Sequence, residues 1–355
     1  MSIEPKTIGI LGSGQLGRMI AVAACQLGLR AHIYAPDADT SPAGDIAHEA
    51  TTAAYDDEAA LRVFGASVDA VTSEFENVPA SVMEILAETC PVSPGAQALF
   101  TTQHRIREKT LAADLGIGTP RFWHIKTEAD LVAAMDELAG PGVLKTCQLG
   151  YDGKGQARIA PNDDMKAALA SLASDDVILE EMINFDMEVS FLVARDATGN
   201  ICHFPASLNT HRNGILAQSI APADIDRLVI ETGQDAAAKL ADAVDLFGVM
   251  ALESFVTADK ELLFNEIAPR PHNSFHWTIE GCATSQFTQL ARILAGMEFG
   301  ATNAYGQWQM NNLLGEDMPM VPDLITTAGV HMHLYGKATA KTGRKMGHTN
   351  RQIRG

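Results

Sequence analysis

Short apolar runs alternate with stretches of helical period over the N-terminal part of the chain. After the first run, a glycine-rich turn leads into apolar positions that recur about every three to four residues, as on one face of a helix. The pattern predicts strands at 7–11, 30–34 and 70–75, with helices between the first two strands and at 81–90. This strand–helix–strand order predicts an open parallel sheet with helices on both faces.

The pattern changes after Pro94-Gly95. A capping box from Thr127 to Asp130 is expected to start a helix, because each end residue can bond the other's backbone amide. The other elements expected here are a helix at 103–115 and short strands at 143–145 and 177–180, with a glycine-rich loop at 146–156.

Strands dominate from residue 187 onward, interrupted by one long helix with Leu240, Val244 and Phe247 on one stripe. The expected strands are 187–194, 201–204, 215–219, 249–257, 261–268 and 330–335, another lies around Met346, and the helix is 224–247. The length and these changes of pattern suggest two or three domains, one of them a small inserted α+β domain at about 113–185.

The composition is that of a globular protein. Of 355 residues, 46% are hydrophobic and 20% charged, which supplies a core and excludes a disordered chain. The formal net charge of −18 argues against a nucleic-acid surface, and no apolar run reaches the roughly 18 residues of a membrane span. The first residues do not have a signal-peptide pattern, and the five cysteines form no C-x-x-C pair. We therefore expect a cytoplasmic protein with free thiols, without disulfides or a structural zinc.

The first candidate site is Gly12-x-Gly14-x-x-Gly17, between a predicted strand and helix. Such a turn presents backbone N–H groups to an anion, and with Asp37 further on it fits the dinucleotide fingerprint. Another phosphorylated ligand would suit the same N–H groups, and a purely connecting turn is also open. Gln15 places an amide at the mouth of the helix, where it can recognise a substrate.

A second candidate site combines Lys145 with the glycine-rich segment 150–156. One fixed cation beside free backbone amides suits a triphosphate, although this is not a Walker A sequence. An ordinary glycine-rich turn is the alternative. The segment Glu180–Ile183 could pair with an adenine edge and Glu188 could accept ribose hydroxyls, but solvated glutamates on a strand fit equally well.

Two carboxylates embedded in apolar strands are the strongest signal. Glu253 and Glu266 lie in runs joined by a short turn, so that hairpin pairing would bring them together. Burying both is costly unless something neutralises them, and Mg²⁺ with oxygen ligands is the simplest answer. Pairing with Lys or Arg is the alternative.

Groups that can bind anions follow these carboxylates. Arg270, His272 and Asn273 form a compact donor cluster that fits a small planar oxyanion. Lys337 and Arg344 are basic residues in an acidic chain, and they form either a phosphate grip or part of a solvated tail.

Together these motifs resemble the ATP-grasp superfamily and, within it, the N5-carboxyaminoimidazole ribonucleotide synthetases of purine biosynthesis. The resemblance runs from Thr7 to about His348. It is carried, in the family's order, by Gly9-Ile-Leu-Gly-Ser-Gly-Gln-Leu-Gly-Arg-Met19, Gly150-Tyr-Asp-Gly-Lys-Gly-Gln156, Asn265-Glu-Ile-Ala-Pro-Arg-Pro-His-Asn-Ser274 and Gly343-Arg-Lys-Met-Gly-His348. It implies three domains, at 1–105, 106–185 and 186–355, in an ATP-grasp fold of the α/β and α+β classes with a Rossmann-like N-terminal domain. A small inserted lid and a C-terminal antiparallel sheet would clamp ATP between them.

The resemblance also implies the activity. ATP and bicarbonate would carboxylate 5-aminoimidazole ribonucleotide through carboxyphosphate, giving ADP and phosphate. Mg²⁺ is the expected metal, and Mn²⁺ could replace it. Neither biotin nor NAD is expected as a cofactor. The expected partners are these small molecules and a second copy of the chain in a homodimer.

Site roles are carried over where residues match. The residues expected to line the ATP site are Arg105, Lys145, Gly150, Tyr151, Asp152, Gly153, Lys154, Gly155, Gln156, Glu180, Glu181, Met182, Ile183, Glu188, His211, Asn265 and Glu266. Those expected at the ribotide are Gln15, Leu16, Glu76, Tyr151, Lys154, Lys337 and Arg344. Arg270, His272, Asn273 and Lys145 would act in catalysis, and Glu253 and Glu266 would hold the metal.

Rival interpretations stay open at this point. A formate-dependent ribonucleotide transformylase or a biotin carboxylase-like subunit would share the ATP residues but use Arg270 differently. An NAD-binding oxidoreductase would leave Lys145 and both metal carboxylates without a role, and a catalytically inactive binding module would not need them. The chain also departs from the family pattern at three places: Ser13, the segment 147–149 and Phe275. The family more often has glycine at the positions of Ser13, Leu149 and Phe275.

Overall fold

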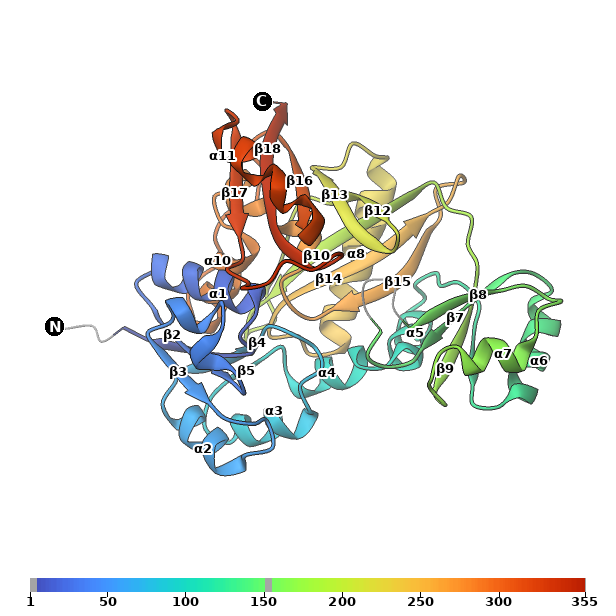
Figure 1. Cartoon of the computed structure of the whole chain (residues 1–355), viewed down its shortest axis with the longest axis horizontal. Coiled ribbons are helices and arrows are strands. Elements are labelled where there is room, and N and C mark those ends of the chain that lie inside the picture. Colours follow the sequence, from blue (N-terminus) through green and yellow to red (C-terminus); the bar gives the residue numbers. More distant parts are fainter. Residues whose placement is uncertain (1–4, 151–154, 355) are drawn as a thin grey trace.

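The computed structural model describes residues 5–150 and 155–354, which form three β-sheets with helices around them (Figure 1). Tyr151, Asp152, Gly153 and Lys154 of the expected ATP loop lie outside the described residues. Among the residues described, no helix is both long and apolar enough to cross a membrane.

The N-terminal sheet is parallel, with the strand order β3-β2-β1-β4-β5. Its strands are β1 (Thr7–Leu11), β2 (Arg30–Ala35), β3 (Glu49–Thr52), β4 (Ala70–Ser73) and β5 (Val92–Ser93). Its helices are α1 (Gln15–Gln26), α2 (Glu58–Ala66) and α3 (Ala80–Ala87). Ile8 and Ile10 of β1 pack toward α1, whereas Leu11 and Val71 pack toward α2 and α3. The predicted open sheet with helices on both faces is therefore confirmed.

A small antiparallel sheet, drawn in green in Figure 1, follows the connecting helices α4 (Ala96–Thr102) and α5 (Arg105–Asp114). Its strand order is β6-β9-β7-β8, and its elements are β6 (Phe122–Ile125), α6 (Glu128–Leu138), β7 (Gly142–Thr146), β8 (Gln156–Ile159), α7 (Met165–Ala170) and β9 (Val177–Glu181). The predicted capping box is confirmed, since Thr127 Oγ1 accepts from the Asp130 N–H at 3.1 Å and Asp130 Oδ2 accepts from the Thr127 N–H at 2.9 Å. This box fixes the start of α6.

The largest sheet is antiparallel, with the order β15-β14-β10-β12-β13-β16-β18-β17 and β11 on β10. Its strands are β10 (Met187–Arg195), β11 (Ile201–His203), β12 (Ser207–Arg212), β13 (Ile215–Ala221), β14 (Gly248–Val256), β15 (Leu262–Ala268), β16 (Gln307–Leu314), β17 (Val330–Leu334) and β18 (Lys345–Arg354). Its helices are α8 (Arg227–Ala243), α9 (Thr278–Gly281), α10 (Gln286–Leu294) and α11 (Val321–Thr326). The long predicted helix is confirmed but is shorter than predicted at both ends. It starts after Asp226, which caps it by accepting from the Leu228 N–H at 2.9 Å, and it ends at Ala243.

Helices cover both faces of this sheet and join it to the N-terminal sheet. Leu240 of α8 is buried with Phe191 and Leu252 on one face. On the other face Phe287 and Leu290 of α10 share a core with Ile8 and Ile20, so α1 and α10 lie between the two sheets. The ends of strands from both sheets consequently meet around one region.

Candidate active site

The two carboxylates predicted to hold a metal lie directly opposite each other, Glu253 on β14 and Glu266 on β15. A register shift follows Glu253, which locally turns the paired strands. Burial, and next the neighbouring Glu266 charge, raise the pKa of Glu253 to about 7. Burial also opposes the charge of Glu266, but Arg105, in an Nη1–Oε2 ion pair of 2.9 Å, outweighs it together with Lys145 and Lys109 and lowers the pKa of Glu266. The predicted hairpin pairing is confirmed.

A buried carboxylate fixes the strand lysine. Lys145 Nζ on β7 donates to Glu180 Oε2 on β9 at 2.9 Å. The fully buried Lys109 of α5 lies 3.3 Å from the same oxygen and donates to the Asn265 carbonyl at 3.0 Å. Burial opposes ionisation of Glu180, but these lysines outweigh it and lower its pKa to about 2. Glu180 therefore positions Lys145 and is not exposed to a ligand.

Lys109 is a site residue that the sequence interpretation missed. It follows Arg105 by one helical turn on α5, and Glu108 lies beside it, with Oε2 accepting from the Ile267 N–H at 3.2 Å. Burial raises the pKa of Glu108 to about 8, although the positive charge of Arg105 opposes this shift. The helical spacing of these charged residues could have shown that they face the same side.

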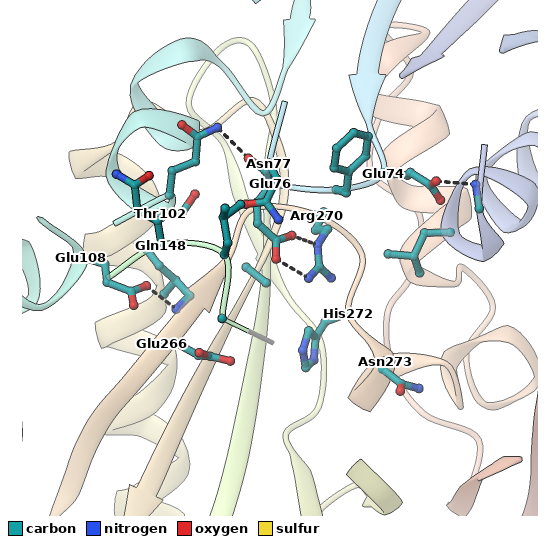
Figure 2. Close-up of a pocket in the computed structure, with 18 of the residues that line it drawn as sticks. Glu74, Glu76, Asn77, Thr102, Glu108, Gln148, Glu266, Arg270, His272 and Asn273 are labelled. Carbon is teal, nitrogen blue, oxygen red and sulfur yellow. Dashed lines mark hydrogen bonds and ion pairs between the residues drawn. The ribbon is translucent and has the colours of Figure 1, made fainter. Parts of the chain in front are cut away.

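The predicted oxyanion cluster is also assembled. Glu76, after β4, binds Arg270 through two guanidinium nitrogens, one contact of 3.1 Å and the other between Nε and Oε2 (Figure 2). Burial opposes the charge of Glu76, but Arg270 outweighs it and lowers the pKa of Glu76. Asn273 and Asn312 exchange side-chain hydrogen bonds of 2.9 and 2.8 Å, which fixes the Asn273 amide.

His272 is a neutral donor in this cluster. Burial and the Arg270 charge lower its pKa well below the usual value. Its Nδ1 accepts from the Ser274 N–H at 3.4 Å, so the neutral ring carries its proton on Nε2. Nε2 lies 3.5 Å from Glu253 Oε1, beside the carboxylate pair.

The glycine-rich turn at β1 binds a carboxylate of the chain itself. Glu74, the residue after β4, accepts from the Gly14 N–H and, at 2.6 Å, from the Gly17 N–H. Gly12 has φ +103°, and a Cβ there would lie 2.4 Å from Glu74 Cγ. The carboxylate thus occupies the position that a pyrophosphate takes in a dinucleotide-binding turn.

Asp37, the other half of the dinucleotide fingerprint, has a partner within the chain. Its Oδ1 accepts from the Ser13 hydroxyl at 2.6 Å. Ser13 is not among the described residues with positive φ, so the departure from glycine adds no backbone strain there. Both features favour a structural role for the turn, with substrate recognition left to its flanking side chains.

Two cavities meet at this region. The first, of about 440 Å³, is lined by Gln15 and Leu16 of α1, by Glu76 after β4 and by Gly150 of the glycine-rich segment. The second, of about 520 Å³, lies over β7, β10 and β12 and is lined by Lys145, Gly155, Gln156, Glu188, His211, Glu253 and Asn265. The residues that line both cavities are Arg105, Glu266, His272, Asn273 and Lys345, whereas Arg270 lines only the first.

The second cavity has a charged wall and an apolar wall. Glu188 forms an ion pair with His211 Nδ1, and this contact raises the pKa of His211 although burial opposes it. Val143, Phe185, Leu216 and Phe255 supply apolar surface, with the two phenylalanine rings stacked 4.5 Å apart. This combination suits a base and a ribose next to a phosphate chain.

Some predicted residues lie outside both cavities. Glu181 pairs with Arg121 at 3.0 Å, and Met182 and Ile183 follow it at the end of β9. Lys337 donates to the Lys345 carbonyl at 2.7 Å, and the exposed Arg344 donates to the Thr339 carbonyl at 3.0 Å. Lys345, which the sequence interpretation passed over beside Arg344, is the first residue of β18 and lines both cavities.

The other departures from the family pattern have different outcomes. Phe275 is fully buried in the core between the two larger sheets and does not line either cavity. Leu149 has φ +61° and an exposed side chain, so it occupies a backbone conformation that favours glycine.

Comparisons with known proteins agree along the whole chain. Family models match residues 5–103 (Ribonucleotide synthetase preATP-grasp domain), 110–287 (ATP-grasp domain) and 309–352 (Phosphoribosylaminoimidazole carboxylase C-terminal domain). The chain is 45% identical over 353 residues to an N5-carboxyaminoimidazole ribonucleotide synthase from Brucella melitensis, covering 99% of this chain and 97% of the relative. It is 42% identical over 344 residues to the Bacillus subtilis enzyme of that name, covering 96% and 90%.

Solved structures of similar proteins carry nucleotides. An N5-carboxyaminoimidazole ribonucleotide synthetase solved as an ADP complex matches with a TM-score of 0.93 and 39% identity, covering 99% of this chain and 94% of the other. The synthase from Aspergillus clavatus, in complex with ADP and 5-aminoimidazole ribonucleotide, matches with a TM-score of 0.92 and 28% identity, covering 98% and 94%.

Proposed function

This chain belongs to the N5-carboxyaminoimidazole ribonucleotide synthase family of ATP-grasp enzymes, and we propose that its two cavities divide that family's substrates between them. The activity is the ATP-dependent carboxylation of 5-aminoimidazole ribonucleotide in purine biosynthesis. ATP would lie in the second cavity and the ribotide in the first. The observation that supports this division is the wall of Arg105, Glu266, His272, Asn273 and Lys345 that both cavities share.

Bicarbonate would bind at that wall. Arg270 is held by Glu76 through two contacts, so its guanidinium is fixed before any ligand arrives. The Nε2–H of neutral His272 and the fixed amide of Asn273 add uncharged donors for a planar oxyanion. An acceptor held here faces the second cavity, from which the γ-phosphate would come.

Lys145 and Arg105 would spread the charge that develops during phosphoryl transfer. Both cations are already anchored, Lys145 on Glu180 and Arg105 on Glu266, so little reorganisation is needed when ATP binds. The resulting carboxyphosphate is fragile in water, and enclosure between the two cavities would protect it until the ribotide amine reacts.

Glu253 and Glu266 fit a magnesium ion. They are paired oxygen donors on neighbouring strands. Burial is the main cause of the raised pKa of Glu253, and the repulsion between the two carboxylates is the next. A divalent cation with oxygen ligands would relieve that repulsion. When bound, Mg²⁺ would neutralise and orient the phosphate oxygens of ATP, and Mn²⁺ would substitute for it.

At the first cavity, Gln15, Leu16 and Glu76 would contact the ribotide, together with Tyr151 and Lys154 of the glycine-rich segment. Lys337 and Arg344, which do not line this cavity, would reach the ribotide phosphate from beside it. We also propose, as carried over from the family, that the protein is a homodimer and acts in the cytoplasm. Sedimentation of the purified protein would test the dimer.

The test is ADP release measured with each substrate omitted in turn. ADP should form only when bicarbonate is present, and N5-carboxyaminoimidazole ribonucleotide should accumulate only with the ribotide. ADP release that is independent of bicarbonate would overturn the assignment of the shared wall.

A further inference from the structure

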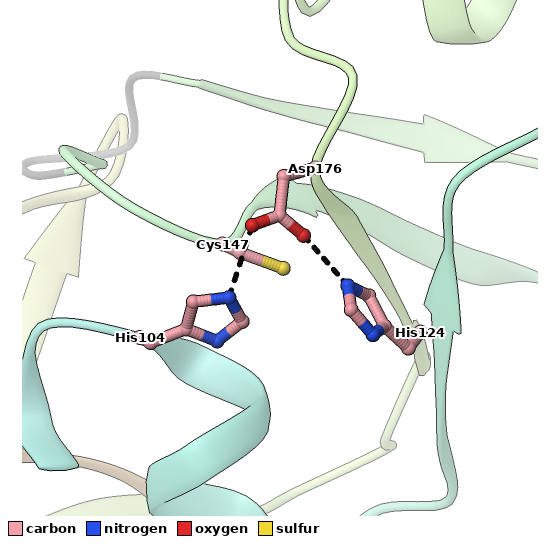
Figure 3. A group of neighbouring side chains, drawn as sticks. All are labelled: His104, His124, Cys147 and Asp176. Carbon is pink, nitrogen blue, oxygen red and sulfur yellow. Dashed lines mark hydrogen bonds and ion pairs between the residues drawn. The ribbon is translucent and has the colours of Figure 1, made fainter.

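Four side chains of types that can bind a metal meet beside the small sheet, away from the wall that both cavities share, and one of them, Cys147, also lines the first cavity. They are His104, His124, Cys147 and Asp176 (Figure 3). Their nearest donor atoms all lie within 4.8 Å of one another. No local spacing in the sequence announces this group, since its members are scattered between residues 104 and 176.

Each member comes from a different element. His104 precedes α5, His124 lies on β6, Cys147 follows β7 and Asp176 precedes β9. The backbone holds two of them together, because the Cys147 N–H donates to the Asp176 carbonyl at 2.9 Å. The group therefore sits where one helix and three strands of the small sheet converge.

The carboxylate lies between the two rings. Asp176 Oδ2 is 3.0 Å from His104 Nε2, and Oδ1 is 2.6 Å from His124 Nε2. Figure 3 shows the Cys147 sulfur between the same two rings. Cys147 is buried, whereas the side chains of His124 and Asp176 are 33% and 37% exposed. The sulfur thus forms the floor of a site with an open mouth.

We propose that these four side chains bind a divalent transition ion of the zinc class. Two imidazoles, one thiolate and one carboxylate are the nitrogen, sulfur and oxygen ligands that Zn²⁺ takes in tetrahedral sites. On binding, the Cys147 S–H bond breaks, its proton leaves to solvent and a sulfur–metal bond forms. A thiolate and a carboxylate then balance the ion's two positive charges, and both rings stay neutral.

The ligand spacing needs only small adjustments to hold a tetrahedral ion. Zinc bonds of about 2.0–2.3 Å place ligand atoms roughly 3.3–3.8 Å apart in a tetrahedron. Side-chain rotation would bring the wider separations, all within 4.8 Å, into that range, and it would open the histidine–aspartate contacts of 3.0 and 2.6 Å by a few tenths of an ångström. Mg²⁺ prefers oxygen ligands and should not compete.

An ion here would stiffen the ATP site from behind. The Cys147 carbonyl accepts from the Arg105 N–H at 3.0 Å, and Cys147 lies two residues after Lys145. Cross-linking these elements would restrain Arg105 and Lys145 together, so zinc should raise the thermal stability of the protein.

Co²⁺ titration of the whole protein tests the proposal without measuring activity. One equivalent should give the near-ultraviolet thiolate-to-cobalt band and the intense visible bands of a tetrahedral site. Cys147→Ser should remove the thiolate band, and the partly exposed His124→Gln should weaken binding by roughly ten-fold or more. Zn²⁺ should displace Co²⁺ and raise the melting temperature of the unmodified protein but not of Cys147→Ser.

Two controls make the result specific. Cys25→Ser removes an exposed thiol whose sulfur lies 3.9 Å from His48 Nδ1, and it should leave the band unchanged. Glu266→Gln should also keep the band, because a carboxylate site gives no thiolate transition. No thiolate band, or a band that survives Cys147→Ser and disappears in Cys25→Ser, would overturn the proposal and leave a hydrogen-bonded cluster.

Discussion

The Arg270 guanidinium and the Glu76 carboxylate meet through two contacts, across 194 positions of sequence. Arg270 lies in the loop after β15, and Glu76 lies after β4 of the parallel sheet. This ion pair therefore ties the two larger sheets together at the wall where their cavities meet. It also fixes the plane of the guanidinium toward any oxyanion bound there.

The first prediction concerns this pair. Arg270→Lys keeps a positive charge but loses the planar fork, so it should strongly reduce ADP formation whether or not the ribotide is present. Arg270→Ala should abolish it, because phosphoryl transfer then has no bound acceptor. Steady-state ADP release against bicarbonate concentration is the measurement. Normal ADP formation by Arg270→Ala would move the bicarbonate site elsewhere.

The second prediction concerns the paired carboxylates. Glu266→Gln and Glu253→Gln keep the side-chain shape but remove a charge from the metal site, so kcat should fall by roughly a hundred-fold or more. The magnesium dependence of ADP release should shift to higher concentration. Circular dichroism of each variant controls for folding. Near-normal activity of both would leave the carboxylates with a structural role.

The third prediction concerns Lys109. Lys109→Met keeps the volume but leaves the buried Glu180 with Lys145 alone, so the free energy of unfolding should fall by about 3 kcal/mol. Glu181→Gln is a matched control, since it breaks the partly exposed pair with Arg121 and should cost about 1 kcal/mol or less. Denaturant unfolding measures both. An equal, small effect of the two variants would show that Lys109 is not the anchor.

Local patterns predicted much of the fold. The β14–β15 hairpin could be predicted because its apolar runs and turn are adjacent, and that alone placed Glu253 opposite Glu266. Strands β12 and β16 were missed because polar residues occupy buried positions in them. Asn209 accepts a hydrogen bond from the Ser219 hydroxyl, and Asn312 donates one to the Leu216 carbonyl, both on β13 of the same sheet. Their pattern therefore lacks the apolar alternation of a half-buried strand.

The missed parts of the site depend on long-range pairing. The hydrogen bond of Glu74 to the Gly14 N–H and the ion pair of Lys109 with Glu180 each join residues about 60 to 70 positions apart. No rule of sequence spacing connects such residues. The dinucleotide interpretation of Gly14 and Gly17 stayed open because their N–H groups bind any carboxylate or phosphate that reaches them. Only the three-dimensional structure shows that Glu74 does.

The fourth prediction concerns Leu149, which has φ +61° just before the glycine-rich loop. Leu149→Gly should raise the free energy of unfolding by up to about 1 kcal/mol, because glycine adopts this conformation without strain and the exposed side chain loses no core contacts. Leu149→Ala keeps the Cβ and should change little. A stabilisation equal in both variants would attribute the gain to removing the exposed side chain.

The last prediction separates the basic residues of the C-terminal segment by substrate. If Lys337 and Arg344 grip the ribotide phosphate, each contact contributes roughly 1.5–3 kcal/mol. Lys337→Ala or Arg344→Ala should then raise the ribotide KM by about ten- to a hundred-fold, with little change in the ATP KM. Lys345 lines both cavities, so Lys345→Ala should raise both KM values. The measurement is steady-state kinetics with each substrate varied in turn. An Arg344→Ala variant with a weakened ATP KM and an unchanged ribotide KM would assign the segment to the nucleotide site.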